Sequence, residues 1–363
     1  MFRPSLLKEG IRMGSLAMKA HVVKQKKYLG DASQICRQIV EECWNGTFYQ
    51  VSNGNFPHFW MRDFGICVDA LLAIDTKKVI SSLAFALEYY EKTGKVTTSI
   101  TKKGKCIDFP VMAADSLPFL VHCLVRAKAG ELVTKYKTFL EEQLRYYYKD
   151  IFDHKTGLVR KDKHFSSMKD HYIRQSSCYD NCMLAMLARD AGELGLSSPF
   201  AGYKFPQLIE ETFWTGAYFL DDLSGKYHVA SDANIFPFWC GLFDDKNMCT
   251  AALQEIHENE LDKPFPAKYT KERHREQELR LPSFFAPNYE GTAIWTHLGF
   301  CMIDIALLVD KKLAQNYINE YKKVIEKNAN VLEVFNPDGT PYRRLFYVRD
   351  EGLLWAAKFL VWI

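Results

Sequence analysis

The feature that most constrains the fold of this chain is an alternation in length between the links that join its helical segments. Apolar residues recur at helical spacing, as in Val79, Leu83, Leu87 and Tyr90. This periodicity predicts helices at residues 33–45, 64–75, 77–93, 114–128, 131–149, 177–194, 204–220, 233–242, 246–257, 291–309, 312–327 and 350–362. Short links alternate with long ones, and the long ones fall at 46–63, 95–113, 150–176, 221–232, 258–290 and 328–349.

Alternate connections of antiparallel helical hairpins emerge at opposite ends, so the six long links should gather on one face. Six hairpins closed in a ring make an all-α, double-layered barrel, the (α/α)6 toroid. Long loops often carry function, and we therefore expect the site on that face. Acidic residues follow the same pattern, since these six lie in the long links or within one turn of them: Asp63, Asp115, Asp170, Asp232, Glu290 and Glu333. Because no Ser-, Gly- or Pro-rich linker divides the chain, we expect a single domain at 31–363 after an N-terminal extension at 1–30.

Composition excludes several classes of protein. A net charge of +3 over 363 residues, with Lys and Arg scattered among polar and acidic residues, argues against a nucleic-acid partner. No apolar run is long enough to span a bilayer, and the N-terminus lacks the apolar core of a signal peptide, so we expect no membrane association and a cytoplasmic location. The ten cysteines are then expected to be reduced thiols. Cys178 and Cys182 have no nearby His or second Cys pair, and no Gly-rich phosphate loop is present, so no metal or other cofactor is expected.

A charged pair among aromatic residues is the first candidate for chemistry. In Trp60-Met61-Arg62-Asp63-Phe64, two charges lie where large apolar side chains seek the interior. Burying a charge is costly unless it is paired or used. One interpretation is a salt-bridged or capping pair at a helix start. The other is a sugar site, in which aromatic walls stack on the ring and raise the pKa of the Asp63 carboxyl towards that of a general acid.

Several segments resemble known enzymes. The stretch HFWMRDFG, at 58–65, resembles the R-D-F segment of neutral and alkaline invertases and related six-hairpin glycosidases. VMAADSLPFL, at 111–120, resembles their A-A-D-S stretch, which implies that Asp115 lines a sugar pocket; a helix N-cap is the alternative. ASDANIFPFWCGLFDD, at 230–245, resembles a segment of glycogen-debranching glucosidases and invertases, and the resemblance implies that Asp232, Asn234 and Trp239 contact the substrate.

Two further segments resemble the same families. PNYEGTAIWTHLG, at 287–299, is similar to the N-Y-W-R-G-P-x-W stretch of processing α-glucosidases and trehalases, although Glu290 stands near where they have Arg and the spacing to Trp295 is one residue longer. VLEVFNPDGTPYRR, at 331–344, resembles their E-x-Y/F-N-P-x-T/D-G segment, which implies that Glu333 is the catalytic base, held beside an N-P-D-G turn. A glutamate on an exposed loop is the alternative. The resemblance runs from Trp44 to Trp355 in the families' order, without the N-terminal β-sandwich that many of them carry.

The resemblance implies an inverting glycoside hydrolase acting on an α-linked glucoside or small oligosaccharide. Inversion needs a protonated acid and an ionised base that activates water, here Asp63 and Glu333. We expect Arg343 and Arg344 to favour ionisation of Glu333. Since Arg62 would lower the pKa of Asp63 if it pointed there, we expect it to turn to a sugar hydroxyl or to another carboxylate such as Asp115. The expected substrate-binding residues are Trp60, Arg62, Asp115, Asp232, Asn234, Trp239, Glu290, Trp295 and Arg343.

Three alternatives stay open at this point. A disaccharide phosphorylase uses the same barrel with phosphate as the nucleophile. A sugar isomerase or epimerase of the double-barrel type relies on histidines, and a non-catalytic barrel would bind sugar alone. His164, Asp170, His171 and Arg174 form a polar cluster in the third long link, which we interpret as loop hydrogen bonding. The sequence gives no indication of oligomeric state.

Overall fold

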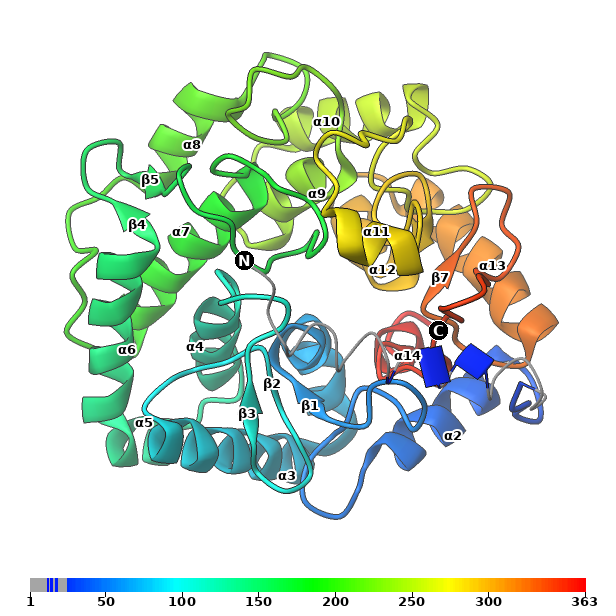
Figure 1. Cartoon of the computed structure of the whole chain (residues 1–363), viewed down its shortest axis with the longest axis horizontal. Coiled ribbons are helices and arrows are strands. Elements are labelled where there is room, and N and C mark those ends of the chain that lie inside the picture. The colour runs from blue at the N-terminus through cyan, green and yellow to red at the C-terminus, as the bar shows by residue number, and fades with distance from the viewer. Residues whose placement is uncertain (1–11, 13, 16, 19–24) are drawn as a thin grey trace.

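The computed structural model describes residues 12, 14, 15, 17, 18 and 25–363, and it confirms the all-α (α/α)6 architecture. Figure 1 shows the helices arranged as a ring around a central opening. The inner layer consists of the first half of α3 (Met61–Thr93), α4 (Ser116–Arg126), α7 (Cys178–Glu193), α9 (Ser231–Trp239), α12 (Thr296–Val309) and α14 (Ala356–Leu360). The outer layer consists of α2 (Ala32–Cys43), the second half of α3, α5 (Gly130–Lys135), α6 (Lys137–Asp150), α8 (Phe205–Phe213), α10 (Lys246–Glu258) and α13 (Lys311–Asn328).

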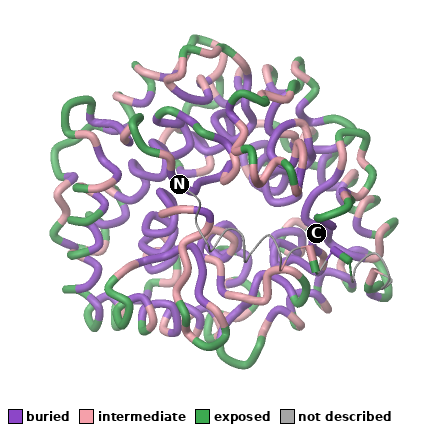
Figure 2. The backbone as a smooth tube through the Cα atoms, viewed as in Figure 1, coloured by how far each residue is buried: buried purple, intermediate pink, exposed green. Residues whose placement is uncertain are grey.

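Burial distinguishes the two layers. The inner helices α7, α9 and α12 are buried over most of their length, whereas outer helices such as α13 bury a single stripe of residues. Figure 2 shows the same contrast, with buried backbone facing the interior of the ring and exposed backbone on its outside. A helix that is apolar on all sides must be surrounded by other elements, and an amphipathic one covers them. The sequence therefore encodes which helix of each hairpin lies inside.

Each inner helix begins after a long link, so all six N-termini point to the same end of the barrel. The first predicted hairpin turn, near Asp75, is a sharp change of direction within α3, where Asp75 leaves the helical conformation (φ −158°, ψ 93°). Backbone N–H groups at a helix N-terminus attract negative charge. The loop-rich end is therefore the end at which acidic side chains are best accommodated.

Very short strands join the long links to one another. Near the first helix, β1 (Phe59–Trp60) pairs with β2 (Ser99–Ile100), which pairs with β3 (Cys106–Ile107). A second ladder, within the third long link, joins β4 (Phe152–Asp153) to β5 (Leu158–Val159). A third joins β6 (Ile294–Trp295) to β7 (Val334–Phe335), so the fifth and sixth long links lie side by side. These ladders fix the loops that the helices alone would leave free.

Some predicted boundaries were wrong. The segment 204–220 ends as a helix at Phe213, because the chain turns at Gly216 in the left-handed region (φ 100°). The segment 350–362 contains only the short α14, and 131–149 divides into α5 and α6 at Tyr136. Helix α11 (Arg280–Phe285) was not predicted and lies within the fifth long link.

The predicted extension at 1–30 lies mostly outside the described residues and stays a prediction. Within the described part of it, Tyr28 is buried, and its backbone N–H donates to the carbonyl of Ala329 at 2.9 Å. All ten cysteines are free thiols. None of the helices in the described part of the chain is long and apolar enough to cross a bilayer.

Candidate active site

A cavity of about 1170 Å³, open to solvent, lies at the end of the barrel where the inner helices begin. Residues from five of the six long links or the helix starts that follow them line it. Four carboxyl groups belong to this lining: Asp63, Asp170, Glu290 and Glu333. The structure therefore brings Asp63 and Glu333, which are remote in the chain, to the wall of one cavity.

The start of α3 positions the first carboxyl. Trp60 is the N-cap residue, its side chain makes no capping hydrogen bond, and its backbone is held in the β1 ladder. Asp63 then falls in the first helical turn. Gly65 allows α3 to lie close to α4, because a Cβ at this position would stand 2.3 Å from the ring of Phe119. The R-D-F-G segment thus places two charged residues in the first turn of α3 and a glycine where α3 packs closely against α4.

Asp63 lies deep in the protein, partly accessible from the cavity, and makes no ion pair with any described residue. The indole Nε1 of Trp355 donates to its Oδ1 at 2.9 Å. Burial raises the pKa of Asp63 to about 6, against the opposing influence of Arg62 and of the Trp355 hydrogen bond. This carboxyl can hold a proton close to neutral pH, as expected for a general acid.

Arg62 turns away from its neighbour and pairs with two other carboxylates. Its Nε lies 2.5 Å from Oδ2 of Asp115, and its two terminal nitrogens lie 3.2 Å from the oxygens of Asp170. The expectation that Arg62 turns to Asp115 is therefore confirmed. Arg62 also explains why the pKa of Asp170 is lowered although burial opposes this.

Asp115 occupies the N-cap position of α4, but its side chain makes no capping hydrogen bond. Its carboxylate pairs with Arg62 and accepts from the hydroxyl of Tyr179 at 2.8 Å, and the residue is fully buried. It does not line the cavity. The predicted substrate contact of Asp115 is therefore corrected: Asp115 supports Arg62, which lines the cavity.

Glu333 is buried, with 2% of its surface exposed, so the alternative of an exposed loop residue was wrong. Tyr347 donates from its hydroxyl to both carboxylate oxygens at 2.9 and 2.7 Å, Tyr289 donates to Oε1, and the backbone N–H of Asp350 donates to Oε2 at 2.8 Å. These donors favour the ionised form, but burial outweighs them and raises the pKa of Glu333 to about 8.

The arginines expected to ionise Glu333 do not line the cavity. Arg343 is exposed, and its backbone pairs with that of Val348 at the tip of the sixth link. The predicted substrate contact of Arg343 is therefore also corrected. The hydrogen-bond donors to Glu333 are instead two tyrosines. Tyr289 is far from Glu333 in the chain, and Tyr347 lies beyond the turn that carries Arg343.

Glu290 is the fourth carboxyl of the cavity and holds a neighbouring loop. It accepts the backbone N–H of Asp170 at 3.1 Å and that of His171 at 2.6 Å. Burial, together with the nearby Asp170, raises the pKa of Glu290 to about 8. The structure thus places Glu290 at the cavity, as predicted, but its carboxylate is also committed to the third long link.

Aromatic and histidine rings complete the lining. Trp60 and Trp295 both face the cavity, and the indole N–H of Trp295 donates to the carbonyl of Tyr289 at 2.6 Å. His171 stacks on Tyr289 with ring centroids 5.5 Å apart. Burial lowers the pKa of His171 to about 4 and that of His297 to about 3, so both rings are neutral at pH 7.

Three residues predicted to contact substrate lie elsewhere. Asp232 belongs to a buried ion-pair network behind the cavity wall. The amide of Asn234 bonds the backbone of Phe219 and the carbonyl of Ala230, which fixes the fourth long link to α9. The indole of Trp239 donates to Asp304 at 2.9 Å. None of the three residues lines the cavity, so these predictions were wrong: Asp232 and Asn234 near the start of α9 and Trp239 at its end use their polar groups inside the barrel.

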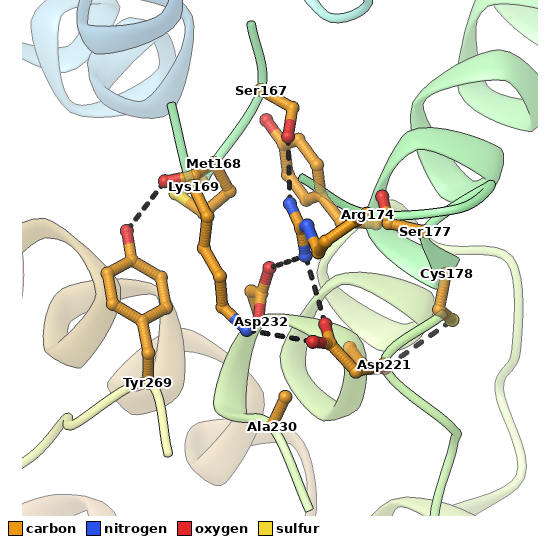
Figure 3. A network of polar contacts seen from close by, with 12 residues as sticks. Ser167, Met168, Lys169, Arg174, Ser177, Cys178, Asp221, Ala230, Asp232 and Tyr269 are labelled. Atoms are coloured by element: carbon orange, nitrogen blue, oxygen red, sulfur yellow. Dashed lines mark hydrogen bonds and ion pairs between the residues drawn. The ribbon is translucent and has the colours of Figure 1, made fainter. Parts of the chain in front are cut away.

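Figure 3 shows this ion-pair network. Arg174 reaches Asp232 at 2.6 Å and Asp221 at 3.0 Å, and Lys169 reaches Asp221 at 3.0 Å. All four side chains are at most 3% exposed. The hydroxyl of Tyr269 donates to the carbonyl of Met168 at 2.8 Å, so the segment that presents Met168, Asp170 and His171 to the cavity is anchored from behind.

Sequence reasoning underestimates the third link and misses the partners of Glu333. Asp170 and His171 line the cavity, which corrects their interpretation as loop hydrogen bonding alone. Tyr289, Tyr347 and Trp355 also line it; Tyr289 lies in the PNYEG motif but was given no role, and no motif pointed to the other two. A search for hydroxyl-bearing residues near each acidic residue would have found Tyr289 in PNYEG.

No family model matches the chain, and no curated protein matches it significantly. Solved structures do match. The fold is that of the six-hairpin glycosidases. A GH63 mannosylglycerate hydrolase from Thermus thermophilus is similar with a TM-score of 0.61 and 14% identity, over 91% of this chain and 99% of that one.

Two other matches cover only part of the solved chain. A bacterial glucoamylase in complex with acarbose matches with a TM-score of 0.63 and 13% identity, over 91% of this chain and 54% of that one. A rhamnosidase from Klebsiella oxytoca with rhamnose bound matches with a TM-score of 0.63 and 11% identity, over 93% of this chain and 64% of that one. At such identities the comparisons establish the fold, and the activity must be argued from the cavity.

Proposed function

We propose that the protein is an inverting glycoside hydrolase that acts on an α-linked glucoside or small oligosaccharide. The observation that carries this proposal is the pair Asp63 and Glu333, two enclosed carboxyls without ion pairs to described residues on the wall of one cavity. A glycosidase needs two carboxyls at one site. The similar structures are described as a mannosylglycerate hydrolase, a glucoamylase and a rhamnosidase, which supports glycoside hydrolysis as the general reaction.

In the proposed mechanism, Asp63 gives its proton to the leaving oxygen while Glu333 removes a proton from water that attacks the opposite face of the sugar ring. The water's oxygen bonds to the anomeric carbon as the glycosidic bond breaks, so the configuration inverts. The hydroxyls of Tyr289 and Tyr347 orient Glu333 and stabilise its ionised form.

The pKa values of the two carboxyls run in the opposite order to their proposed roles, because the proposed base, Glu333, has the higher value. With values of about 6 for Asp63 and about 8 for Glu333, the form with protonated Asp63 and ionised Glu333 is a minor one, and its population is largest midway between them. We assign the acid role to Asp63 rather than Asp170, because Arg62 keeps Asp170 ionised.

The remaining lining residues have supporting roles in the proposal. Trp60 and Trp295 offer ring faces for stacking against a pyranose. Arg62 and Glu290 hold Asp170, whose oxygens remain partly exposed to accept sugar hydroxyls. In the proposal, Arg62, Asp170 and Glu290 therefore bind the sugar together as one hydrogen-bonded group.

The cavity favours hydrolysis over phosphorolysis and over histidine-based isomerisation. Among the described residues that line it, Arg62 is the only cationic side chain, and all three of its nitrogens are paired with carboxylates. Phosphate therefore has no free cation to bind there. The two lining histidines remain neutral at pH 7, and neither bonds to a carboxylate of the described residues that would raise its basicity.

A substrate screen with stereochemical analysis tests the proposal. Purified protein is incubated with α-linked glucosides, mannosides and rhamnosides, including di- and oligosaccharides, and the first product anomer is identified by proton NMR. We expect release of reducing sugar with inverted configuration, lost in Asp63→Asn and Glu333→Gln variants that remain folded. Retention of configuration, or full activity in either variant, would contradict the mechanism.

A further inference from the structure

The cavity lining contains a second group of residues that the mechanism does not use. Phe56, Phe109, Leu281, Pro282 and Phe285 line the cavity and are each only half-buried. By contrast, Glu290, Glu333 and His297 are exposed by no more than 6%. Glu290, Glu333 and His297 thus form the floor of the cavity, Asp63 and Asp170 are partly accessible from it, and the five apolar residues form an apolar rim around its opening.

The apolar rim continues onto the outer surface. The ring of Phe285 lies 5.4 Å from that of Phe284 and 5.7 Å from that of Phe346. The rings of Phe284 and Phe346 are stacked on each other with their centroids 5.8 Å apart. Phe284 is 67% exposed and Leu345 is 65% exposed. We call Phe284, Phe285, Leu345 and Phe346 the outer patch. It is continuous with the cavity through Phe285, which belongs to both sets.

The fold gives no reason for this patch. Helix α11, which supplies Phe284 and Phe285, contains no buried residue, so its apolar side chains do not stabilise the core. Large exposed apolar side chains usually scatter over a surface, and a gathering of them is typical of a surface that binds a ligand, another protein or a membrane. The position of the patch at the mouth of the cavity points to the part of the ligand that leaves the floor and emerges towards solvent.

We propose that the site takes glycosides whose leaving group is apolar, an alkyl or aryl aglycone, with the sugar on the floor and the aglycone on the apolar rim and outer patch. This inference rests on the proposed hydrolase function. A second sugar in that position would present several hydroxyls, and among the described residues the apolar rim has no side-chain donor or acceptor for them. Each hydroxyl left unpaired weakens binding by roughly tenfold.

An alkyl aglycone, in contrast, gains binding free energy by burying its methylene groups against the apolar rim and outer patch. Each methylene that becomes fully buried strengthens binding by about fourfold. An aryl aglycone can in addition stack on Phe285 or Phe109. The floor selects the sugar through charged and hydrogen-bonding groups, and the apolar rim selects the aglycone through contact area.

A matched series of substrates tests the inference. The series carries α-D-glucosyl, α-D-mannosyl or α-L-rhamnosyl groups, each as the methyl, butyl, hexyl, octyl and phenyl glycoside and as a disaccharide. For the sugar that is accepted, we expect kcat/KM to rise at least thirtyfold from methyl to hexyl, then level off, and to exceed that of the disaccharide. The gain should appear mainly in KM, because the aglycone contacts are alike in the ground and transition states.

Variants locate the effect. The double change Phe284→Ser and Phe346→Ser should reduce the octyl-to-methyl ratio of kcat/KM at least tenfold. Leu308→Ser is the matched control, because Leu308 is 57% exposed near the end of α12, away from the cavity, and it should leave the ratio unchanged. Circular dichroism and thermal unfolding verify that each variant is folded.

The outcomes separate this inference from the proposed function. Hydrolysis with no dependence on chain length, or with preference for the disaccharide, would overturn the inference and leave the hydrolase assignment intact. No hydrolysis of any glycoside would remove both. An unchanged ratio in the double variant, together with loss of self-association in gel filtration or of binding to phosphatidylcholine vesicles, would assign the patch to a second copy or to a membrane surface and would also overturn the inference.

Discussion

Two groups of carboxyls lie deep within the same end of the barrel, and they differ in what neutralises them. In the ion-pair network, Asp221 and Asp232 are in contact with Lys169 and Arg174, and the pKa of Asp221 is held well below its usual range by these cations. At the cavity, burial raises the pKa values of Asp63 and Glu333 to about 6 and about 8. Both groups are surrounded by protein. The difference between them is the presence of a cation.

This difference separates a carboxylate suited to a structural role from one that can exchange a proton near neutral pH. A carboxylate paired on both oxygens cannot take or give a proton near neutral pH, and breaking its pair is costly. A carboxyl held by neutral donors, such as Glu333 with two tyrosine hydroxyls and a backbone N–H, stays able to change its protonation state. The network stabilises the loop, and the cavity holds carboxyls that reduce stability but can react.

Removing a network carboxylate should mainly affect stability. In Asp232→Asn, Arg174 loses its closest carboxylate while Asp221 remains, and breaking a buried pair typically costs about 3–5 kcal/mol. We expect the free energy of unfolding, measured by urea denaturation, to fall by that order. The kcat of the folded enzyme should stay within tenfold of wild type. A loss of more than a hundredfold in kcat, with little loss of stability, would place Asp232 in the catalytic site instead.

Removing a cavity carboxyl should have the opposite effect on stability. The folded-state pKa of Glu333 is raised from 4.5 to about 8, so the folded protein binds more protons than the unfolded chain between these values. Stability therefore falls as pH rises through this window and is constant above it. Glu333→Gln should be more stable than wild type at pH 9 by on the order of 3 kcal/mol, and the advantage should disappear near pH 4.

Urea denaturation of both proteins at pH 4, 6 and 9 measures that advantage. Glu278→Gln serves as a comparison, because Arg273 pairs with Glu278 and lowers its pKa, and this variant should gain no stability at high pH. A Glu333→Gln variant that is less stable than wild type at pH 9 would mean that the donors around Glu333 outweigh its burial.

The pH profile of kcat/KM should show a smaller effect than these changes in stability, with activity falling on both the acidic and the alkaline side. In the proposed mechanism the free protein is active only when the two carboxyls carry one proton between them, on Asp63. The plot of kcat/KM against pH should therefore be bell-shaped, with apparent pKa values near 6 and 8 and a maximum near pH 7. Activity should fall about tenfold for each pH unit beyond either limb. Tyr347→Phe removes a donor to ionised Glu333 and should move the upper limb further up. A profile without an upper limb would exclude Glu333 from the titrating pair.

The sequence predicted the ring of hairpins, the end that carries the site and the two carboxyls on its cavity, because these depend on periodicity, link length and local motifs. It failed for Asp115, Asp232, Asn234, Trp239 and Arg343, although the first four lie in segments with an equally good resemblance. Whether an acidic residue faces a cavity or a buried cation depends on contacts between distant segments, such as Asp232 with Arg174. Neither periodicity nor spacing contains that information.

The same limit applies to the aromatic loops. Helix α11 has too few residues and too little amphipathic pattern to be predicted, yet it supplies three residues of the cavity lining, Leu281, Pro282 and Phe285. The predicted pKa order of the two carboxyls was wrong, since the pKa is about 6 for Asp63 and about 8 for Glu333. Burial raises the pKa of Glu333 more than its hydrogen-bond donors lower it, and the depth of burial depends on packing between distant segments.

The most direct test of the account compares the two carboxyl variants on glycosides with poor and good leaving groups. Asp63→Asn should lose about 10²- to 10⁴-fold in kcat on an alkyl glycoside, but far less on the glycosyl fluoride, which needs no proton from the enzyme. Glu333→Gln should lose a similar factor on both, since water must be deprotonated in either case. Equal losses in Asp63→Asn on both substrates, or near wild-type turnover in Glu333→Gln, would contradict the assignment of one neutral and one negative carboxyl at this cavity.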